Sequence, residues 1–188
     1  MHFTLTDLVT DITQNAVEAG ADTVELEISE SISPNGSPNG GGEFRFLVKD
    51  NGKGMTEEEL NRAIDPFVTD GIKHPNRKVG LGLPFLIQTA QQSGGGWDIK
   101  SKKGEGTLVT AWFDTGNVDI PPTGDISGMF RTILMFNSKA EIILRRKKSD
   151  NDEYEVRKSE LIEALGGLED TRSLILLGDY LRSLEESE

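Results

Sequence analysis

The sequence contains no cysteine, which excludes disulfide bonds and thiolate metal sites. It also lacks any apolar run near 18 residues, about the length that a membrane-spanning helix requires. The polar segment from Thr4 to Asn15 follows Met1 directly, so we expect no signal peptide. These absences favour a soluble, cytoplasmic protein that does not contact a membrane.

Basic residues are few: 20 Lys and Arg stand against 32 Asp and Glu, and the formal net charge is −12. Both halves of the chain are acidic, which argues against a nucleic-acid partner. One basic run, Arg145 to Lys148, interrupts this pattern. We interpret it as a solvated strand end, with contact to a partner as the alternative.

The length of 188 residues leaves room for one domain of ordinary size plus an extension. The segment from Gly116 to Gly124 contains Pro121-Pro122 and marks a shift in composition. We therefore expect an N-terminal domain over residues 1–116 and a small α/β C-terminal extension over residues 117–188. The residue chemistry of the extension indicates no role for it.

Hydrophobic periodicity predicts the helices and strands. Apolar residues step by three and four after Thr4, and Asp7 completes a capping box with Thr4. Thr56 and Glu59 form a second capping box, and Gly20 is expected to end the first helix. We expect helices near 5–19, 56–63, 82–92, 125–136, 159–165 and 171–184, strands near 24–28, 44–48, 97–101, 107–113, 140–146 and 153–157, and loops over 34–42 and 66–79. The first two strands should pair as a hairpin.

Four short segments bear the functional pattern: Asp11 to Ala19, Asp50-Asn51-Gly52-Lys53-Gly54 with Met55, Gly80-Leu81-Gly82-Leu83, and Gly104-Glu105-Gly106-Thr107. In this order they resemble the four nucleotide-binding boxes of the superfamily of gyrase, heat-shock chaperones, histidine kinases and mismatch-repair ATPases (GHKL). The resemblance covers about residues 1 to 115. It implies the Bergerat ATP-binding fold, an α/β (α+β) two-layer sandwich with a mixed, mostly antiparallel sheet and helices on one face. ATP and Mg²⁺ are the expected cofactors.

In the first box, Asp11, Asn15 and Glu18 are spaced i, i+4 and i+7 and so share one helix face. Mg²⁺ prefers oxygen ligands and keeps several waters, which suits one amide oxygen plus phosphate oxygens. The resemblance implies that Asn15 is the metal ligand and that Glu18 and Ala19 lie at the nucleotide. Asp11 occupies the position of the ATPase branches' glutamate general base, and its side chain is one methylene shorter. A carboxylate there can deprotonate a water that attacks the γ-phosphate.

The second and fourth boxes are expected to hold the base. Asp50 follows a strand, and its carboxylate can accept a hydrogen bond from the exocyclic amine of adenine, where guanine offers a carbonyl. Gly52 and Gly54 permit a sharp turn and a close approach, and Met55 can pack on the ring. By resemblance, Thr107 begins the strand beneath the adenine.

The third box ends a loop and opens a helix, a setting in which backbone amides bind phosphate. No Gly-Lys-Ser/Thr follows, so the segment is not a P-loop. The residues before it resemble a short ATP lid, in which Lys73 and Lys78 offer positive charge to the phosphates. The expected nucleotide contacts of this region are Lys73, Lys78, Val79, Gly80, Leu81, Gly82 and Leu83.

The branch of the superfamily remains open at this point. Residues 63–90 are most similar to a histidine-kinase catalytic domain, whereas Glu18 matches the ATPase branch. The chain also resembles small stand-alone ATP-binding proteins of anaerobic bacteria, often encoded beside iron-hydrogenase genes. One interpretation is a kinase-like regulator that acts on a separate partner, such as a response regulator, an anti-sigma-type target or a redox enzyme. The alternatives are an ATP-gated switch or slow ATPase with Asp11 as base, and a non-catalytic nucleotide-binding module.

Overall fold

The computed structural model describes residues 3–31, 41–65, 82–149 and 151–186. The helices are α1 (Leu5–Glu18), α2 (Glu57–Ile64), α3 (Gly82–Gln92), α4 (Ile126–Leu134), α5 (Lys158–Leu165) and α6 (Thr171–Glu186). The strands are β1 (Thr23–Ser31), β2 (Glu43–Asp50), β3 (Gly96–Lys102), β4 (Gly106–Asp114), β5 (Glu141–Ser149) and β6 (Asp152–Arg157). All of the predicted helices and strands are present, with bounds that differ by a few residues. The predicted loop over 66–79 and most of the one over 34–42 lie outside the described residues.

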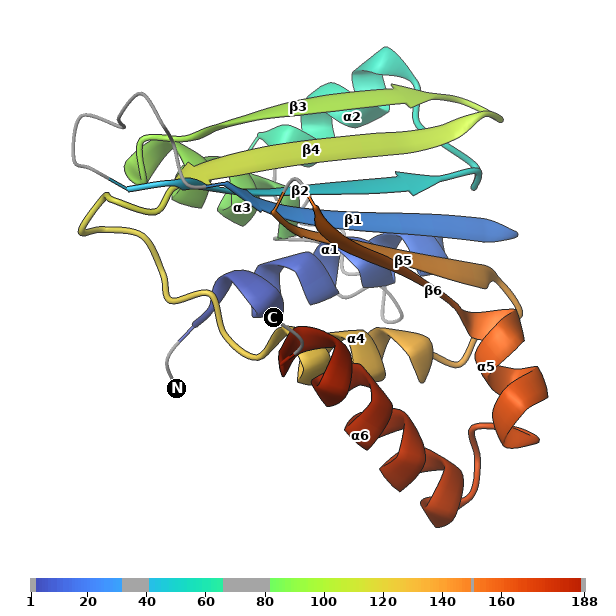
Figure 1. Cartoon of the computed structure of the whole chain (residues 1–188). Coiled ribbons are helices and arrows are strands. Elements are labelled where there is room, and N and C mark those ends of the chain that lie inside the picture. The colour runs from blue at the N-terminus through green and yellow to red at the C-terminus, as the bar shows by residue number, and fades with distance from the viewer. Residues whose placement is uncertain (1–2, 32–40, 66–81, 150, 187–188) are drawn as a thin grey trace.

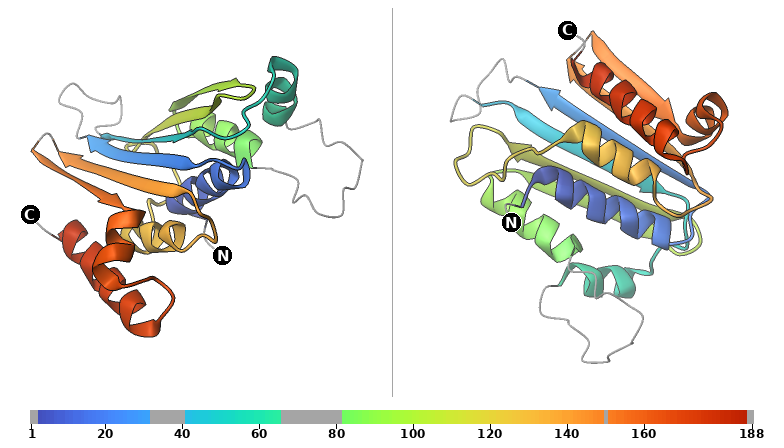
Figure 2. Two further views of the ribbon diagram at one scale, coloured as in Figure 1. Left: turned by 90° about the vertical axis from the view of Figure 1, so that its right-hand side faces the viewer. Right: turned by 90° about the horizontal axis from the view of Figure 1, so that it is seen from below.

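The strands form one mixed sheet in the order β3-β4-β2-β1-β5-β6. β1 and β5 pair in parallel, and the other neighbours pair antiparallel. Helices α1, α3, α4 and α6 cover one face of this sheet (Figures 1 and 2). The predicted α+β sandwich is therefore confirmed. Within the described ranges, no helix combines the length and the apolar character needed to cross a membrane.

Local sequence signals account for the ends of α1 and α2. The Thr4 hydroxyl accepts a hydrogen bond from the Asp7 N–H at 3.2 Å, and the Asp7 carboxylate accepts one from the Thr4 N–H at 2.9 Å. Thr56 and Glu59 form the same reciprocal pair. Both capping boxes satisfy backbone donors that the first helical turn cannot pair. Gly20, at a φ of +76°, ends α1 in a conformation that L side chains rarely adopt.

The core lies between the sheet and the helices that cover it, α1 among them. Alternate residues of β1 and β2 point toward the helices, and Val24, Leu26 and Ile28 are fully buried. The two strands pair antiparallel, with Leu26 opposite Val48, which confirms the predicted hairpin. The apolar stripe of α1 packs on this surface, so the polar side of the helix faces away from the sheet.

The C-terminal part of the chain completes the same sheet. β5 lies beside β1, with Leu144 opposite Leu26, and β6 forms the sheet edge. The carbonyls of Pro122 and Thr123 accept hydrogen bonds from the first N–H groups of α1, both at 2.9 Å. The connecting segment is thereby attached to the start of α1. The division into residues 1–116 and 117–188 stays a prediction.

The prediction that the basic run is a solvated strand end is wrong for Arg146, although Lys147 is exposed. Its side chain is only 4% exposed and forms ion pairs with Glu30 of β1 and Glu185 of α6, each at 3.3 Å. The Tyr154 hydroxyl also donates to Glu185, and burial together with this contact raises the pKa of Tyr154. The reason is the two-residue period of β5, which places Arg146 on the same inner face as Leu144.

Candidate functional site

The first box lies on the open side of α1. Asp11, Asn15 and Glu18 are exposed, whereas Ile12 and Ala16 are buried against the sheet. The Glu18 carboxylate accepts a hydrogen bond from the Gln14 amide at 2.8 Å. The three polar side chains therefore occupy a surface that a ligand can reach.

The start of α3 lies against this surface. A β-carbon added at Gly82 would stand 3.3 Å from the Asn15 amide nitrogen and 4.0 Å from the Asp11 β-carbon. Two boxes that are far apart in the sequence thus meet at one place. The first N–H groups of a helix have no partner within the helix, and such groups at the start of α3 favour a negatively charged ligand.

Asp50 occupies the end of β2 and is almost completely buried, with 7% of its surface exposed. Its Oδ1 atom accepts a hydrogen bond from the Gly52 N–H at 2.8 Å. Burial raises the pKa of the Asp50 carboxyl, and backbone hydrogen bonds from Gly52 and Thr107 oppose that rise. A buried carboxylate with one oxygen engaged by its own turn retains acceptor capacity for a ligand.

Close backbone contacts bring the first, second and fourth boxes together. The Lys53 N–H donates to the Ala19 carbonyl at 3.0 Å, and a β-carbon at Gly52 would stand 2.8 Å from the same oxygen. A β-carbon at Gly54 would stand 1.9 Å from the Lys102 carbonyl oxygen, and Gly54 has a φ of +56°. Contact distances therefore require glycine at both positions, and the positive φ is a further reason at Gly54.

Sequence reasoning missed two residues that hold the site together. The Ser101 hydroxyl accepts a hydrogen bond from the Met55 N–H and lies 2.8 Å from the Thr107 hydroxyl. Asn51 Oδ1 accepts from the N–H groups of Asp22 and Thr23, both at 2.9 Å. Pairing the strands around the Lys102–Gly106 turn would have placed Ser101 opposite Thr107. Nothing in the sequence singles out the role of Asn51.

Several expected contacts lie outside the described residues: Lys73, Lys78, Val79, Gly80 and Leu81. Their approach to phosphate stays a prediction. Leu83 is half-buried in the first turn of α3 and packs against the core. Only the end of the third box is therefore placed relative to α1.

The donor chemistry fits a metal that is held mainly by its nucleotide. Among the described residues there is no group of three or more His, Cys, Asp or Glu side chains that could hold a metal ion. Asn15 offers one amide oxygen beside the N-terminus of α3, which suits Mg²⁺ when phosphate and water supply the other ligands. The residues present thus fit a Mg²⁺–nucleotide complex.

Comparison with known proteins agrees with this geometry. A model of the family "Histidine kinase-, DNA gyrase B-, and HSP90-like ATPase" matches residues 3–117. The chain is 35% identical over 77 residues to the DNA mismatch repair protein MutL of Thermus aquaticus, and this match covers 41% of this chain and 13% of that protein. It is 28% identical over 120 residues to the sensor histidine kinase ZraS of Escherichia coli (strain K12), and this match covers 64% of this chain and 23% of that protein. The chain therefore spans less than a quarter of the length of either relative.

One solved structure shares the fold over most of the chain. It is the N-terminal domain of a DNA repair protein, with a TM-score of 0.54 and 12% identity, and the match covers 91% of this chain and 58% of that chain. The structural match covers more of this chain than residues 3–117, which the family model matches. The shared fold therefore includes most of the residues after 117.

Proposed function

The chain belongs to the family of histidine kinase-, DNA gyrase B- and HSP90-like ATPases, and from this premise we propose that it binds ATP with Mg²⁺ and acts as a kinase-like regulator of a separate protein. One observation supports the nucleotide site above others. The open side of α1 contacts both the Asp50 turn, through Ala19, and the start of α3, through Asn15. A ligand in that position would meet a buried acceptor at one end and helix-terminal amides at the other.

Each group in the site then has a defined task. Asp50 accepts a hydrogen bond from the adenine amine, and Gly52 and Gly54 let the backbone approach the base. Asn15 coordinates Mg²⁺, and the amides at the start of α3 bind phosphate. The metal neutralises phosphate charge when it is bound, while the residues of the chain orient the nucleotide.

The partner is a protein that receives the phosphoryl group: a response regulator, an anti-sigma-type target or a subunit associated with a redox enzyme such as an iron hydrogenase. The likeness to a sensor histidine kinase supports transfer to another protein. The test is incubation with ATP labelled at the γ-phosphate, Mg²⁺ and each candidate partner. Label on the partner supports the proposal, and release of free phosphate alone contradicts it in favour of an ATPase.

A slow ATPase or ATP-gated switch is the second candidate, because Asp11 is exposed beside Gly82 at the expected phosphate position. If Asp11 is a general base, Asp11→Asn should lower hydrolysis roughly 10²- to 10⁴-fold, since proton abstraction from water is lost. ATP affinity, measured by calorimetry on the same variant, should stay nearly unchanged. A hydrolysis rate equal to that of the wild type would favour the kinase or a non-catalytic binding module.

The metal role of Asn15 predicts a specific loss. Mg²⁺ should strengthen ATP binding in the wild type. Asn15→Ala should lose most of this strengthening, a loss of roughly tenfold in the affinity for ATP with Mg²⁺. The affinity for ATP without metal should persist. Gln14→Ala, which changes the neighbouring amide, is the matched control and should keep the gain. ATP titrations of each variant in Mg²⁺ and in EDTA measure the affinities with and without metal. Equal dependence on Mg²⁺ in Asn15→Ala and wild type would show that Asn15 is not the ligand.

A further inference from the structure

β6, α5 and α6 lie at the opposite edge of the sheet from α2 and α3 (Figure 2). A pocket of about 410 Å³ lies between these three elements. Val156 and Leu161 form its buried apolar floor, and Leu176 and Tyr180 of α6 form one wall. None of the described residues of the four nucleotide-binding boxes lines it.

The wall formed by α6 is apolar and open to solvent. Leu176 and Tyr180 are 47% and 45% exposed, and their i, i+4 spacing places them on one side of the helix. Ile175, beside Leu176 in the sequence, is 58% exposed. Large apolar side chains that gather around a pocket are typical of an interaction surface, whereas single ones are common everywhere.

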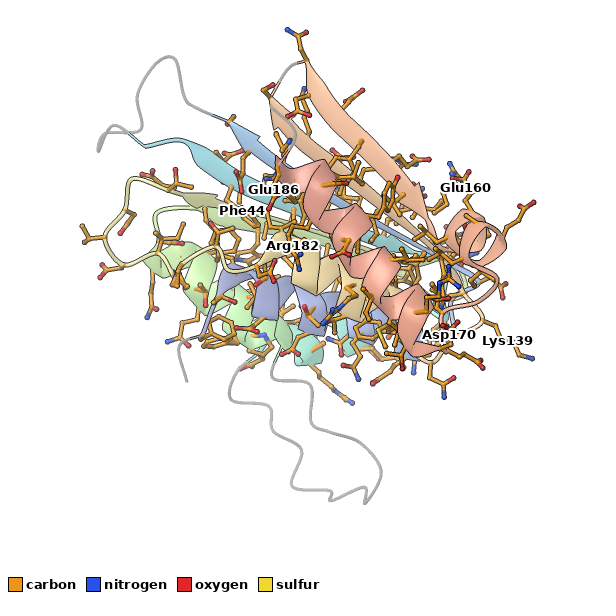
Figure 3. The ribbon with its side chains drawn as sticks, turned by 60° about the horizontal axis from the view of Figure 1, so that its bottom comes forward. Phe44, Lys139, Glu160, Asp170, Arg182 and Glu186 are labelled. Carbon is orange, nitrogen blue, oxygen red and sulfur yellow. The ribbon has the colours of Figure 1, made fainter. Side chains whose placement is uncertain are left out.

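The two helices that border the pocket expose more acidic than basic side chains. On α5, on α6 and in the turn between them, the exposed acidic side chains are Glu160, Glu163, Glu169, Asp170, Asp179 and Glu186, and the exposed basic ones are Arg172 and Arg182. Figure 3 shows Glu160 on α5 and Asp170 and Glu186 at the two ends of α6. Of these acidic residues, Glu160 lines the pocket. Glu155 and Arg157 line it as well and pair with each other at 2.7 Å.

We propose that this α5–α6 groove binds an amphipathic helix of a partner protein, with Leu-type side chains in the pocket and Lys or Arg side chains opposite the exposed acidic side chains of α5 and α6. The apolar wall and floor match the apolar stripe of such a helix, in the helix-in-groove mode of recognition. The acidic excess on α5 and α6 disfavours a second copy of this chain, because like charges would face each other. The proposal concerns a surface separate from the nucleotide site and does not depend on ATP binding.

The test uses the full chain and three fluorescent synthetic helices in the absence of nucleotide. The first is an amphipathic helix of Leu and Lys, the second has the same composition with the leucines distributed around the helix, and the third replaces Lys by Glu. Fluorescence anisotropy should show saturable binding of the first and about tenfold weaker binding, or less, of the other two. Equal binding of the first and second peptides would overturn the proposal.

Matched variants locate the binding. The double variant Leu176→Ala/Tyr180→Ala should weaken binding of the Leu/Lys helix about tenfold or more, because anchors at the centre of an interface dominate affinity. Glu160→Lys should weaken it less and mainly at low salt. Val118→Ala and Asp119→Lys change an exposed apolar and an exposed acidic residue outside the pocket and should leave binding within about twofold.

Two results would overturn the assignment. If Asp119→Lys weakens binding as much as Glu160→Lys, the peptide binds through net charge and not through the groove. If light scattering shows a concentration-dependent dimer that the Leu176→Ala/Tyr180→Ala variant abolishes, the surface joins two copies of this chain. Circular dichroism melts of all variants exclude unfolding as the cause, since each changed side chain is exposed.

Discussion

Arg146→Ala is expected to destabilise the fold by about 3 kcal/mol, because it leaves the Glu185 carboxylate and the Tyr154 hydroxyl without the buried cation between β5 and α6. Removing one partner of a buried ion pair typically costs about 3–5 kcal/mol. The lower end applies here, because Glu30, the other partner, is 40% exposed and can regain water. For a chain of this size the melting temperature should fall by roughly 6–12 °C.

The adjacent residue provides the control. Arg145 lies on the outer face of the same strand, 37% exposed, and pairs with Glu25 at 2.6 Å and Glu155 at 2.7 Å. Exposed ion pairs contribute about 0.2–1 kcal/mol each, so the loss of two in Arg145→Ala should lower stability by about 1 kcal/mol, well below the loss at Arg146. Chemical denaturation of both variants measures the difference. Equal losses would contradict the internal role assigned to Arg146.

Asp50→Asn is expected to weaken ATP binding roughly 10- to 150-fold. The change replaces part of an acceptor by a donor that faces the adenine amine, and a lost hydrogen bond to a charged group costs about 1.5–3 kcal/mol. The fold should survive, because the amide oxygen can still accept from the Gly52 N–H that Oδ1 engages at 2.8 Å. Isothermal titration calorimetry of ATP measures the loss.

Asp114 supplies a matched control for that experiment. It ends β4 at the opposite end of the β2–β4 pair, and its Oδ1 accepts from the Gly116 N–H at 2.9 Å, the same Asp-x-Gly arrangement. Asp114→Asn should leave ATP affinity within about twofold of wild type, since it lies far from the four boxes. Unchanged affinity in a folded Asp50→Asn protein would remove Asp50 from the base-binding role.

The sequence predicted the individual elements well, because their signals are local. Thr4 with Asp7, and Thr56 with Glu59, mark helix starts within one turn, and the alternation in β1 and β2 needs only a few residues. The order of the strands could not be predicted in the same way. β5 pairs in parallel with β1 through contacts between residues more than a hundred positions apart, and no local pattern encodes such contacts.

Charge patterns were the least reliable guide. Four consecutive basic residues predict a solvated strand end, yet the two-residue period of the strand places Arg146 on the inner face, where it pairs with Glu185 of α6. The partner of a buried charge is set by tertiary packing and cannot be found from composition. Within the site, the boxes were located by resemblance, whereas Ser101 and Asn51 became evident only through their hydrogen bonds.

Titration of the wild-type chain with Mg²⁺-ATP and Mg²⁺-GTP tests whether the site recognises adenine. We predict saturable binding of ATP and at least about tenfold weaker binding of GTP, because guanine places a carbonyl where Asp50 requires a donor. Absence of ATP binding, or equal affinity for the two nucleotides, would contradict it.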